Sequence, residues 1–275
     1  MQIDYPTLLV TAAGTCLVLG LLCFVMAQSE TPLRPLRLCG FGHLCFALGM
    51  PMLLLRGGPY AAFGIVLGNS IGLFGWGLQV VAVRRCAGRP PWAWLPPAAA
   101  GTWMLACLVP AFMASFPTRA FLGGGLAGLL AGLAAWELAR SWTGWRPLRP
   151  IILLLCGLHP LAQLLRMAAA ALHGAEGVAA LNPAMVLSGL AAIFACTVVL
   201  VPEALRRAER QAGARLAAAH ADTAASRRLA VAADREPAGG GLHEPHPAGF
   251  PLDPDLPRQQ HRKGHRLAAR FARCR

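Results

Sequence analysis

Long apolar stretches separated by short polar segments fill most of the chain, and a polar region follows residue 202. Seven stretches, at residues 8–26, 38–55, 60–83, 92–115, 121–139, 151–172 and 185–201, have roughly the 20 apolar residues with which a helix crosses about 30 Å of hydrocarbon. They lack the strict alternation of a membrane barrel strand. The pattern therefore predicts an all-α, polytopic membrane protein with seven transmembrane helices.

The arginines between these stretches indicate how the chain crosses the membrane. The segments after the first, third and fifth stretches contain Arg34, Arg37, Arg84, Arg85, Arg89, Arg140, Arg146 and Arg149. The segments after the second, fourth and sixth contain only Arg56 and Arg119. Short cytoplasmic loops are enriched in Lys and Arg. The distribution therefore predicts an N-terminus outside the cytoplasm and a C-terminus inside it.

Two further regions follow the predicted membrane domain of residues 1–202. Residues 203–234 are rich in Ala, Leu, Arg and Glu, which predicts a cytoplasmic linker helix. Its first basic residues, Arg206, Arg207 and Arg210, lie next to the membrane and are predicted to contact anionic headgroups of the lipid bilayer. Residues 235–275 are dense in Pro, Gly, His and Arg, which is typical of a disordered basic tail.

Composition and charge exclude several other classes. Hydrophobic residues make up 56% of the 275 residues and charged residues 13%, about half the charged fraction of a soluble domain. The net charge of +13 raises the question of nucleic acid. Many arginines flank apolar stretches, where the membrane rule accounts for them, so we predict no nucleic-acid partner. The nine cysteines include no C-x-x-C pair, which argues against a disulfide framework and a zinc site.

Several known catalytic signatures are absent from the sequence. It contains no HExxH, Walker loop or paired-carboxylate constellation. The HEPHP segment of the tail has no acids or cysteines at ligand spacing to complete a metal site. We therefore predict no catalytic residue, no metal and no cofactor.

Polar residues within apolar stretches are the candidate ligand-binding residues, because ionisable groups are costly at membrane depth. His159, Gln163 and Arg166 are spaced by four and three residues, which places them on one helix face. Arg166 is suited to an anionic ligand. The alternative is that the three satisfy one another and nearby backbone.

A weaker set of candidates comprises His43, Asn69 and Gln79, with Ser70 beside them. Hydrogen bonds between helices would account for this set without a ligand. Glu137 precedes Arg140 by three residues near a cytoplasmic helix end, which predicts a solvated ion pair.

Small residues recur at every fourth position of the fifth stretch, at Gly124, Gly128 and Gly132. Such a stripe lets helix backbones approach closely. It indicates either packing within the bundle or the contact surface of a homodimer.

The segment GNSIGLFGWGLQVVAVRRCAGRPPW (residues 68–92) resembles the third span and following loop in the membrane input regions of bacterial GGDEF diguanylate cyclases. PTRAFLGGGLAGLLAGLAAWELAR (117–140) and LHPLAQLLRMAAAAL (158–172) are similar to later helices, and ALRRAERQAGARLAAAHAD to the connecting helix. In that family a membrane sensor controls a cytoplasmic dimeric domain that makes cyclic di-GMP.

The chain departs from this family where the catalytic domain would start. It has neither the opening motif D-x-L-T-G-L-x-N-R nor GGDEF, and LDPDLPRQQHRKGH (252–265) only faintly echoes a later motif. One hypothesis is that the chain beyond about Asp234 is truncated or translated out of frame. Translating the other reading frames tests this idea.

The preferred hypothesis is a signal-input module of the bacterial inner membrane, which transmits an unidentified small-molecule or membrane stimulus through its last helix. The alternative is a small transporter or permease component, for which the His159, Gln163 and Arg166 face would line the path. A third hypothesis is a membrane protein with a purely structural role. Substitution of Arg166 by Gln distinguishes them: a sensor loses its response, a transporter its flux and a structural protein its stability.

Overall fold

The computed structural model describes residues 4–28, 34–141 and 149–234, and every regular element in these ranges is a helix. The all-α fold is confirmed for these residues. The elements are α1 (Tyr5–Ala27), α2 (Arg34–Met52), η2 (Leu53–Gly57), α3 (Ala61–Cys86), α4 (Leu95–Cys107), α5 (Pro110–Ala114), α6 (Phe116–Ser141) and α7 (Arg149–Asp234). The predicted tail, 235–275, lies outside the described residues.

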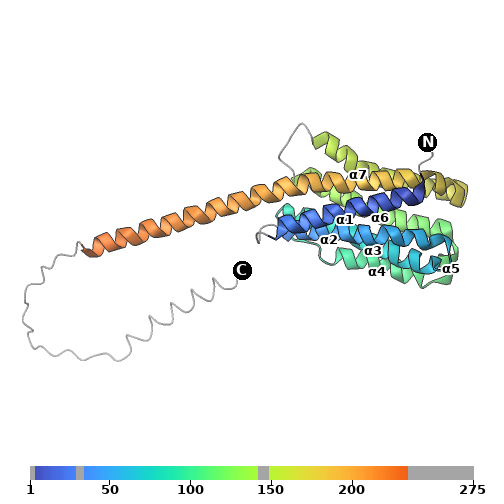
Figure 1. Cartoon of the computed structure of the whole chain (residues 1–275), viewed down its shortest axis with the longest axis horizontal. Helices are drawn as coiled ribbons and strands as arrows, with labels where there is room; N and C mark the ends of the chain where they lie inside the picture. Colours follow the sequence, from blue (N-terminus) through green and yellow to red (C-terminus); the bar gives the residue numbers. More distant parts are fainter. Residues whose placement is uncertain (1–3, 29–33, 142–148, 235–275) are drawn as a thin grey trace, which may run out of the picture. The chain divides into compact units, whose positions relative to one another are not determined.

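The chain divides into two units, Met1–Ala218 and Ala219–Arg275, and of the second the structure describes only the helical residues 219–234. In the first unit, α2 packs against α1 and α3, and α3 also packs against α4 and α6 (Figure 1). Residues 203–234 are helical, as their composition predicts.

Helix α7 consists of two helices that meet at Gly174. Gly174 has φ 63° and ψ −140°, which lies outside the helical region. A positive φ is readily adopted by glycine, which has no Cβ. The break separates residues 149–173 from 175–234 and corresponds to the gap between the sixth and seventh apolar stretches. Figure 1 shows the two parts of α7 meeting at the end of the bundle near the N-terminus.

In the described ranges, five helices are long and apolar enough to cross a membrane: Tyr5–Ala27, Pro35–Arg56, Ala61–Cys86, Phe116–Arg140 and Pro150–Arg228. The last contains the break at Gly174 and therefore two of the predicted stretches. The fourth stretch, 92–115, is not one helix, which corrects our expectation. It breaks before Pro110 into α4 and α5, and the 13 residues of α4 rise only about 20 Å.

The surface of the bundle is apolar. Leu21, Leu129 and Leu164 lie on different helices, and more than half of each is exposed. Large exposed apolar surfaces on a protein mark a contact with lipid or with other proteins. Together with the long apolar helices, this surface supports a location in a membrane.

A buried ion network joins α3 and α6 at the end of the bundle that carries Arg84 and Arg140, which we call the arginine-rich end. Glu137 is only 3% exposed and pairs with Arg84 and, at 2.7 Å, with Arg89. Arg140 instead lies over the ring of Trp136. The expected solvated pair of Glu137 with Arg140 is therefore wrong, because the carboxylate faces the core and not the solvent.

The small residues of α6 support packing within the chain. Gly124 and Gly128 lie against Gln163 of α7, where an added Cβ would come within 3.2 and 3.3 Å of its side chain. Nothing lies within 4 Å of a Cβ built on Gly132. Two of the three glycines thus allow α6 to pack closely against α7. This agrees with packing within the bundle, one of the two interpretations of the glycine stripe.

Candidate ligand-binding site

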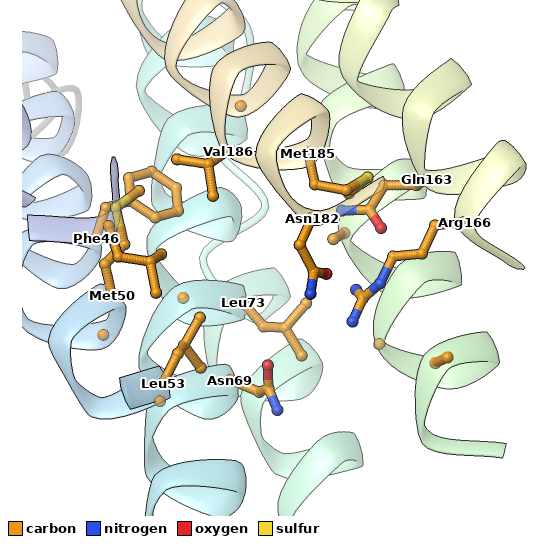
Figure 2. Close-up of a pocket in the computed structure, with 18 of the residues that line it drawn as sticks. Phe46, Met50, Leu53, Asn69, Leu73, Gln163, Arg166, Asn182, Met185 and Val186 are labelled. Carbon is orange, nitrogen blue, oxygen red and sulfur yellow. The ribbon is translucent and has the colours of Figure 1, made fainter. Parts of the chain in front are cut away.

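A cavity of about 370 Å³ lies between the helices at the opposite end of the bundle from the arginine-rich end. We call this the N-terminal end, because Tyr5, η2 and the break at Gly174 lie there. Side chains from α1, α2, η2, α3, α4, α6 and both parts of α7 line the cavity. Figure 2 shows Phe46 and Met50 on one side of this space and Gln163 and Arg166 on the other.

The polar face predicted on residues 151–172 lines this cavity with all three of its residues, His159, Gln163 and Arg166. The Gln163 Nε2 group donates to His159 Nε2 over 3.1 Å. Since that ring nitrogen accepts, the proton lies on Nδ1, which donates to Ser188 Oγ over 3.2 Å. The Ser188 hydroxyl donates in turn to a backbone carbonyl. His159 is therefore a neutral, fixed part of the wall, and its ring stacks on Trp76.

Two polar atoms of this face have no hydrogen-bond partner among the described residues. They are Gln163 Oε1 and Arg166 Nε, and both are buried. Buried polar groups are almost always hydrogen-bonded in native proteins. Gln163 is committed through its amide nitrogen, so its oxygen remains free to accept a hydrogen bond within the cavity.

Arg56 and Arg119 approach the same cavity from the ends of other helices. Arg56, in η2, donates through Nη2 to Asn69 Oδ1 over 2.7 Å, while its buried Nε has no partner among the described residues. Asn69 is fixed by its own bond to the Ile65 carbonyl. Arg119 lies in the first turn of α6. The hydrogen bonds thus hold one of these guanidinium groups in a defined position.

The positive charges of Arg56, Arg119 and Arg166 are not compensated by acids in the cavity wall. Among the described residues that line it, there is no Asp or Glu. Asp4, the nearest acid in sequence to Tyr5, instead accepts hydrogen bonds from the backbone and hydroxyl of Thr7 at the start of α1. Arg56 is repelled electrostatically by both Arg119 and Arg166. The cavity is consequently a site of positive electrostatic potential.

Apolar and aromatic side chains form the rest of the wall. Trp76 is buried between Phe46 and His159, with ring centroids 5.2 and 4.9 Å away. Trp103 of α4 is 2% exposed and donates its indole N–H to the Ile65 carbonyl. Trp103 thereby satisfies its polar atom, and the rings present flat apolar surfaces. The site therefore combines a cationic part with a rigid aromatic part.

A second hollow of about 330 Å³ adjoins the cavity and shares Arg56, Arg166 and Asn182 with it. It extends to Pro6 and Ala175, which lie at the N-terminal end of the bundle. Asn182 in the second part of α7 points into the same space as Arg166 (Figure 2). The site thus continues from the interior of the bundle to its N-terminal end.

The other predicted residues are divided between two places. Asn69 lines the cavity, whereas His43 and Gln79 lie in a separate buried cluster with Cys39 and Thr197. Gln79 Nε2 lies 3.0 Å from His43 Nδ1, and Thr197 Oγ1 lies 2.9 Å from His43 Nε2. This cluster therefore agrees with the alternative given for these residues in the sequence analysis, which is hydrogen bonding between helices without a ligand. Ser70 donates within its own helix.

Sequence reasoning missed Arg56, Arg119 and Asn182 as parts of the site. Arg56 and Arg119 were treated only as loop charges in the count that set the orientation. They were nevertheless the exceptions to that count, because they are the only basic residues in the loops predicted to be external. A cation at an unfavoured position is a signal that could have identified them.

Metal ligands do not gather in the described part of the chain, where no group of three His, Cys, Asp or Glu residues is placed to hold a metal ion. No family model, curated protein or solved structure matches the chain. The interpretation of the site rests on its geometry and chemistry.

Proposed function

We propose that the chain is a signal-input module of a bacterial inner membrane, similar to the membrane regions of GGDEF diguanylate cyclases. In this proposal seven crossings, the fourth formed by α4 and α5 together, place the N-terminus outside and residues 203–234 in the cytoplasm. The distribution of arginines and the family resemblance of residues 68–92, 117–140 and 158–172 support it. The stimulus enters the cavity from the outer face.

The observation that carries the proposal is that both parts of α7 line the cavity. Gln163 and Arg166 come from the first part, and Asn182, Met185 and Gly189 from the second. The second part continues as helix beyond the arginine-rich end. A molecule held between the two parts contacts the helix that leaves the membrane. It would shift the bundle between two states if it bound them unequally.

The arginine-rich half of the bundle is densely packed, which favours an input module over a transport path. Cys39, Leu138 and Ala195 belong to one buried apolar cluster there. The His43 cluster and the buried pair of Arg84 with Glu137 add fixed polar contacts. A transport path through this half would have to open these contacts.

A transporter remains the second candidate, because interrupted helices border the cavity. The breaks before Pro110 and at Gly174 are of the kind that secondary transporters use near their binding sites. Under this alternative the bundle would open alternately to both sides, and liposomes that contain the protein would take up an external anion.

A cavity-filling substitution tests the input function without a known ligand. Gly72 lines the cavity, and nothing lies within 4 Å of a Cβ built on it. We expect Gly72→Phe to occupy the cavity and to change hydrogen–deuterium exchange in residues 203–218 of the full chain in lipid nanodiscs. Gly14→Phe is the matched control, because Gly14 is equally open but lies on the outer surface of α1.

The outcomes separate the input module from the transporter. An input module transmits the change, so exchange differs at 203–218 in Gly72→Phe and not in Gly14→Phe. Unchanged exchange at 203–218, with altered exchange confined to the cavity wall, contradicts the proposal. Anion uptake by liposomes that Gly72→Phe abolishes indicates the transporter instead.

The lipid contacts predicted for the linker belong to the same proposal. Arg206 and Arg207 lie 3.8 and 3.2 Å from Glu203, whereas Arg210 is exposed. We propose that Arg210, together with the outer faces of the other two, contacts anionic headgroups on the cytoplasmic side. These contacts would fix the height of the linker relative to the membrane surface.

A further inference from the structure

The cavity has a charge pattern that defines what it is suited to bind. Arg56, Arg119 and Arg166 place three positive charges around one space, and no described residue of its wall carries a negative charge. Uncompensated charges are costly away from water unless a partner pairs with them. A ligand that supplies negative charge removes this cost, whereas a neutral or cationic ligand does not.

The unpartnered atoms show where the ligand's polar contacts form. Arg56 Nε and Arg166 Nε are buried donors without an acceptor among the described residues. Guanidinium groups bind carboxylate and phosphate through charge-assisted hydrogen bonds, which are among the strongest in proteins. Gln163 Oε1 is a buried acceptor nearby, suited to a hydroxyl or amide of the same ligand.

The apolar wall shows that the ligand is larger than an inorganic anion. Trp76, Phe46, Leu73 and Met185 lie beside the polar groups and border the same space. A volume of about 370 Å³ is within the range of small-molecule pockets in proteins. An inorganic phosphate would leave these side chains against water, so an apolar body attached to the acidic group fits better.

We propose that the cavity binds a small amphipathic anion. Its phosphate or carboxylate head contacts Arg56, Arg119 and Arg166, and its apolar body lies against the wall that Trp76 and Phe46 form. This inference rests on the proposed function, since it names the ligand class to which the input module responds. The same chemistry is found in soluble organic acids and in anionic lipids, and the test separates these two sources.

The first arm measures thermal unfolding of the full chain in nanodiscs of phosphatidylcholine. We expect phenyl phosphate to raise the midpoint in a concentration-dependent manner, because a ligand that binds only the folded state stabilises it. Phenyltrimethylammonium, which has the same ring and the opposite charge, should leave the midpoint unchanged. The second arm compares nanodiscs with and without phosphatidylglycerol and detects retained lipid by native mass spectrometry.

Arg166→Gln is the decisive variant, and Arg85→Gln is its control because Arg85 is exposed on α3 outside the cavity. We expect Arg166→Gln to weaken binding about tenfold or more, as the loss of a charge-assisted hydrogen bond predicts. Without ligand it should be at least as stable as the wild type, because one of three repelling charges is removed. If this variant does not fold, Arg119→Gln supplies the same test.

Binding of phenyl phosphate that depends on Arg166 supports the proposal with a soluble ligand. Retention of phosphatidylglycerol that depends on Arg166 supports it with a lipid. Binding of neither, or binding that Arg166→Gln leaves unchanged, overturns it. Its failure is distinguishable from failure of the input function, because the response of residues 203–218 to Gly72→Phe requires no anion.

Discussion

Neutralising Glu137 should destabilise the bundle strongly, although this residue is far from the cavity. Glu137 is 3% exposed, and its partner Arg84 is 7% exposed. Glu137→Gln keeps the shape of the side chain and removes its charge. Arg84 then remains buried without a charged partner among the described residues, and beside the new amide it keeps the Pro90 carbonyl, 3.1 Å from its Nε, and the face of Trp92.

The expected loss follows from this burial. Removing one partner of a buried ion pair costs about 3–5 kcal/mol in the free energy of unfolding. Arg89, the second partner, keeps 30% of its side-chain surface exposed and can be solvated again. The Trp92 ring continues to stabilise Arg84 by a cation–π contact. We therefore expect a loss near the lower limit, about 3 kcal/mol.

The assay is reversible unfolding of the purified chain in mixed micelles, followed by circular dichroism as the denaturing detergent is increased. Glu176→Gln is the control, because Glu176 is exposed and should change stability by less than about 0.5 kcal/mol. The double variant Glu137→Leu with Arg84→Met should lose less free energy of unfolding than Glu137→Gln, since no charge of the pair remains buried. A loss below about 1 kcal/mol for Glu137→Gln would refute the argument.

Three further predictions concern packing, the buried polar cluster and orientation. Gly77→Ala should lower the free energy of unfolding by about 1–3 kcal/mol, because the added Cβ would come within 2.5 Å of the α4 backbone. Its control, Gly101→Ala, places a Cβ where nothing lies within 4 Å and should be neutral or stabilising in the same unfolding assay. Thr197→Val removes the hydroxyl that contacts His43 and should cost about 1–3 kcal/mol, with Thr197→Ser restoring most of it. A fluorescent protein fused after Arg275 should mature and alkaline phosphatase fused there should be inactive, and the reverse pattern would contradict the proposed orientation.

Part of the site was predictable because helix periodicity is a local property. Residues four and three apart share a helix face, so the joint position of His159, Gln163 and Arg166 on the cavity wall followed from their numbers alone. The sequence did not show what they face. Whether these residues satisfy one another or leave atoms free depends on side-chain orientation, which the hydrogen bond of Gln163 to His159 decides.

The contribution of Arg56 and Arg119 depended on packing between distant segments. These residues are 63 positions apart in the sequence. Arg56 lies in η2, and Arg119 lies in the first turn of α6. Only the arrangement of η2, α6 and α7 brings them to the cavity that Arg166 lines. Glu137 shows the same limit: the sequence suggested its neighbour Arg140 as a partner, whereas its salt bridges to Arg84 and Arg89 join it to α3 and to the segment after α3.

The order of residues was enough to predict a helical chain that is apolar enough for a membrane, because hydrophobicity and helix propensity act over a few consecutive residues. It also marked the break between the last two apolar stretches, where Gly174 permits a positive φ. The tertiary structure alone decided which polar groups meet. The free energy of a buried charge depends on its neighbours in space, and packing chose these for Glu137, His43 and the three arginines of the cavity.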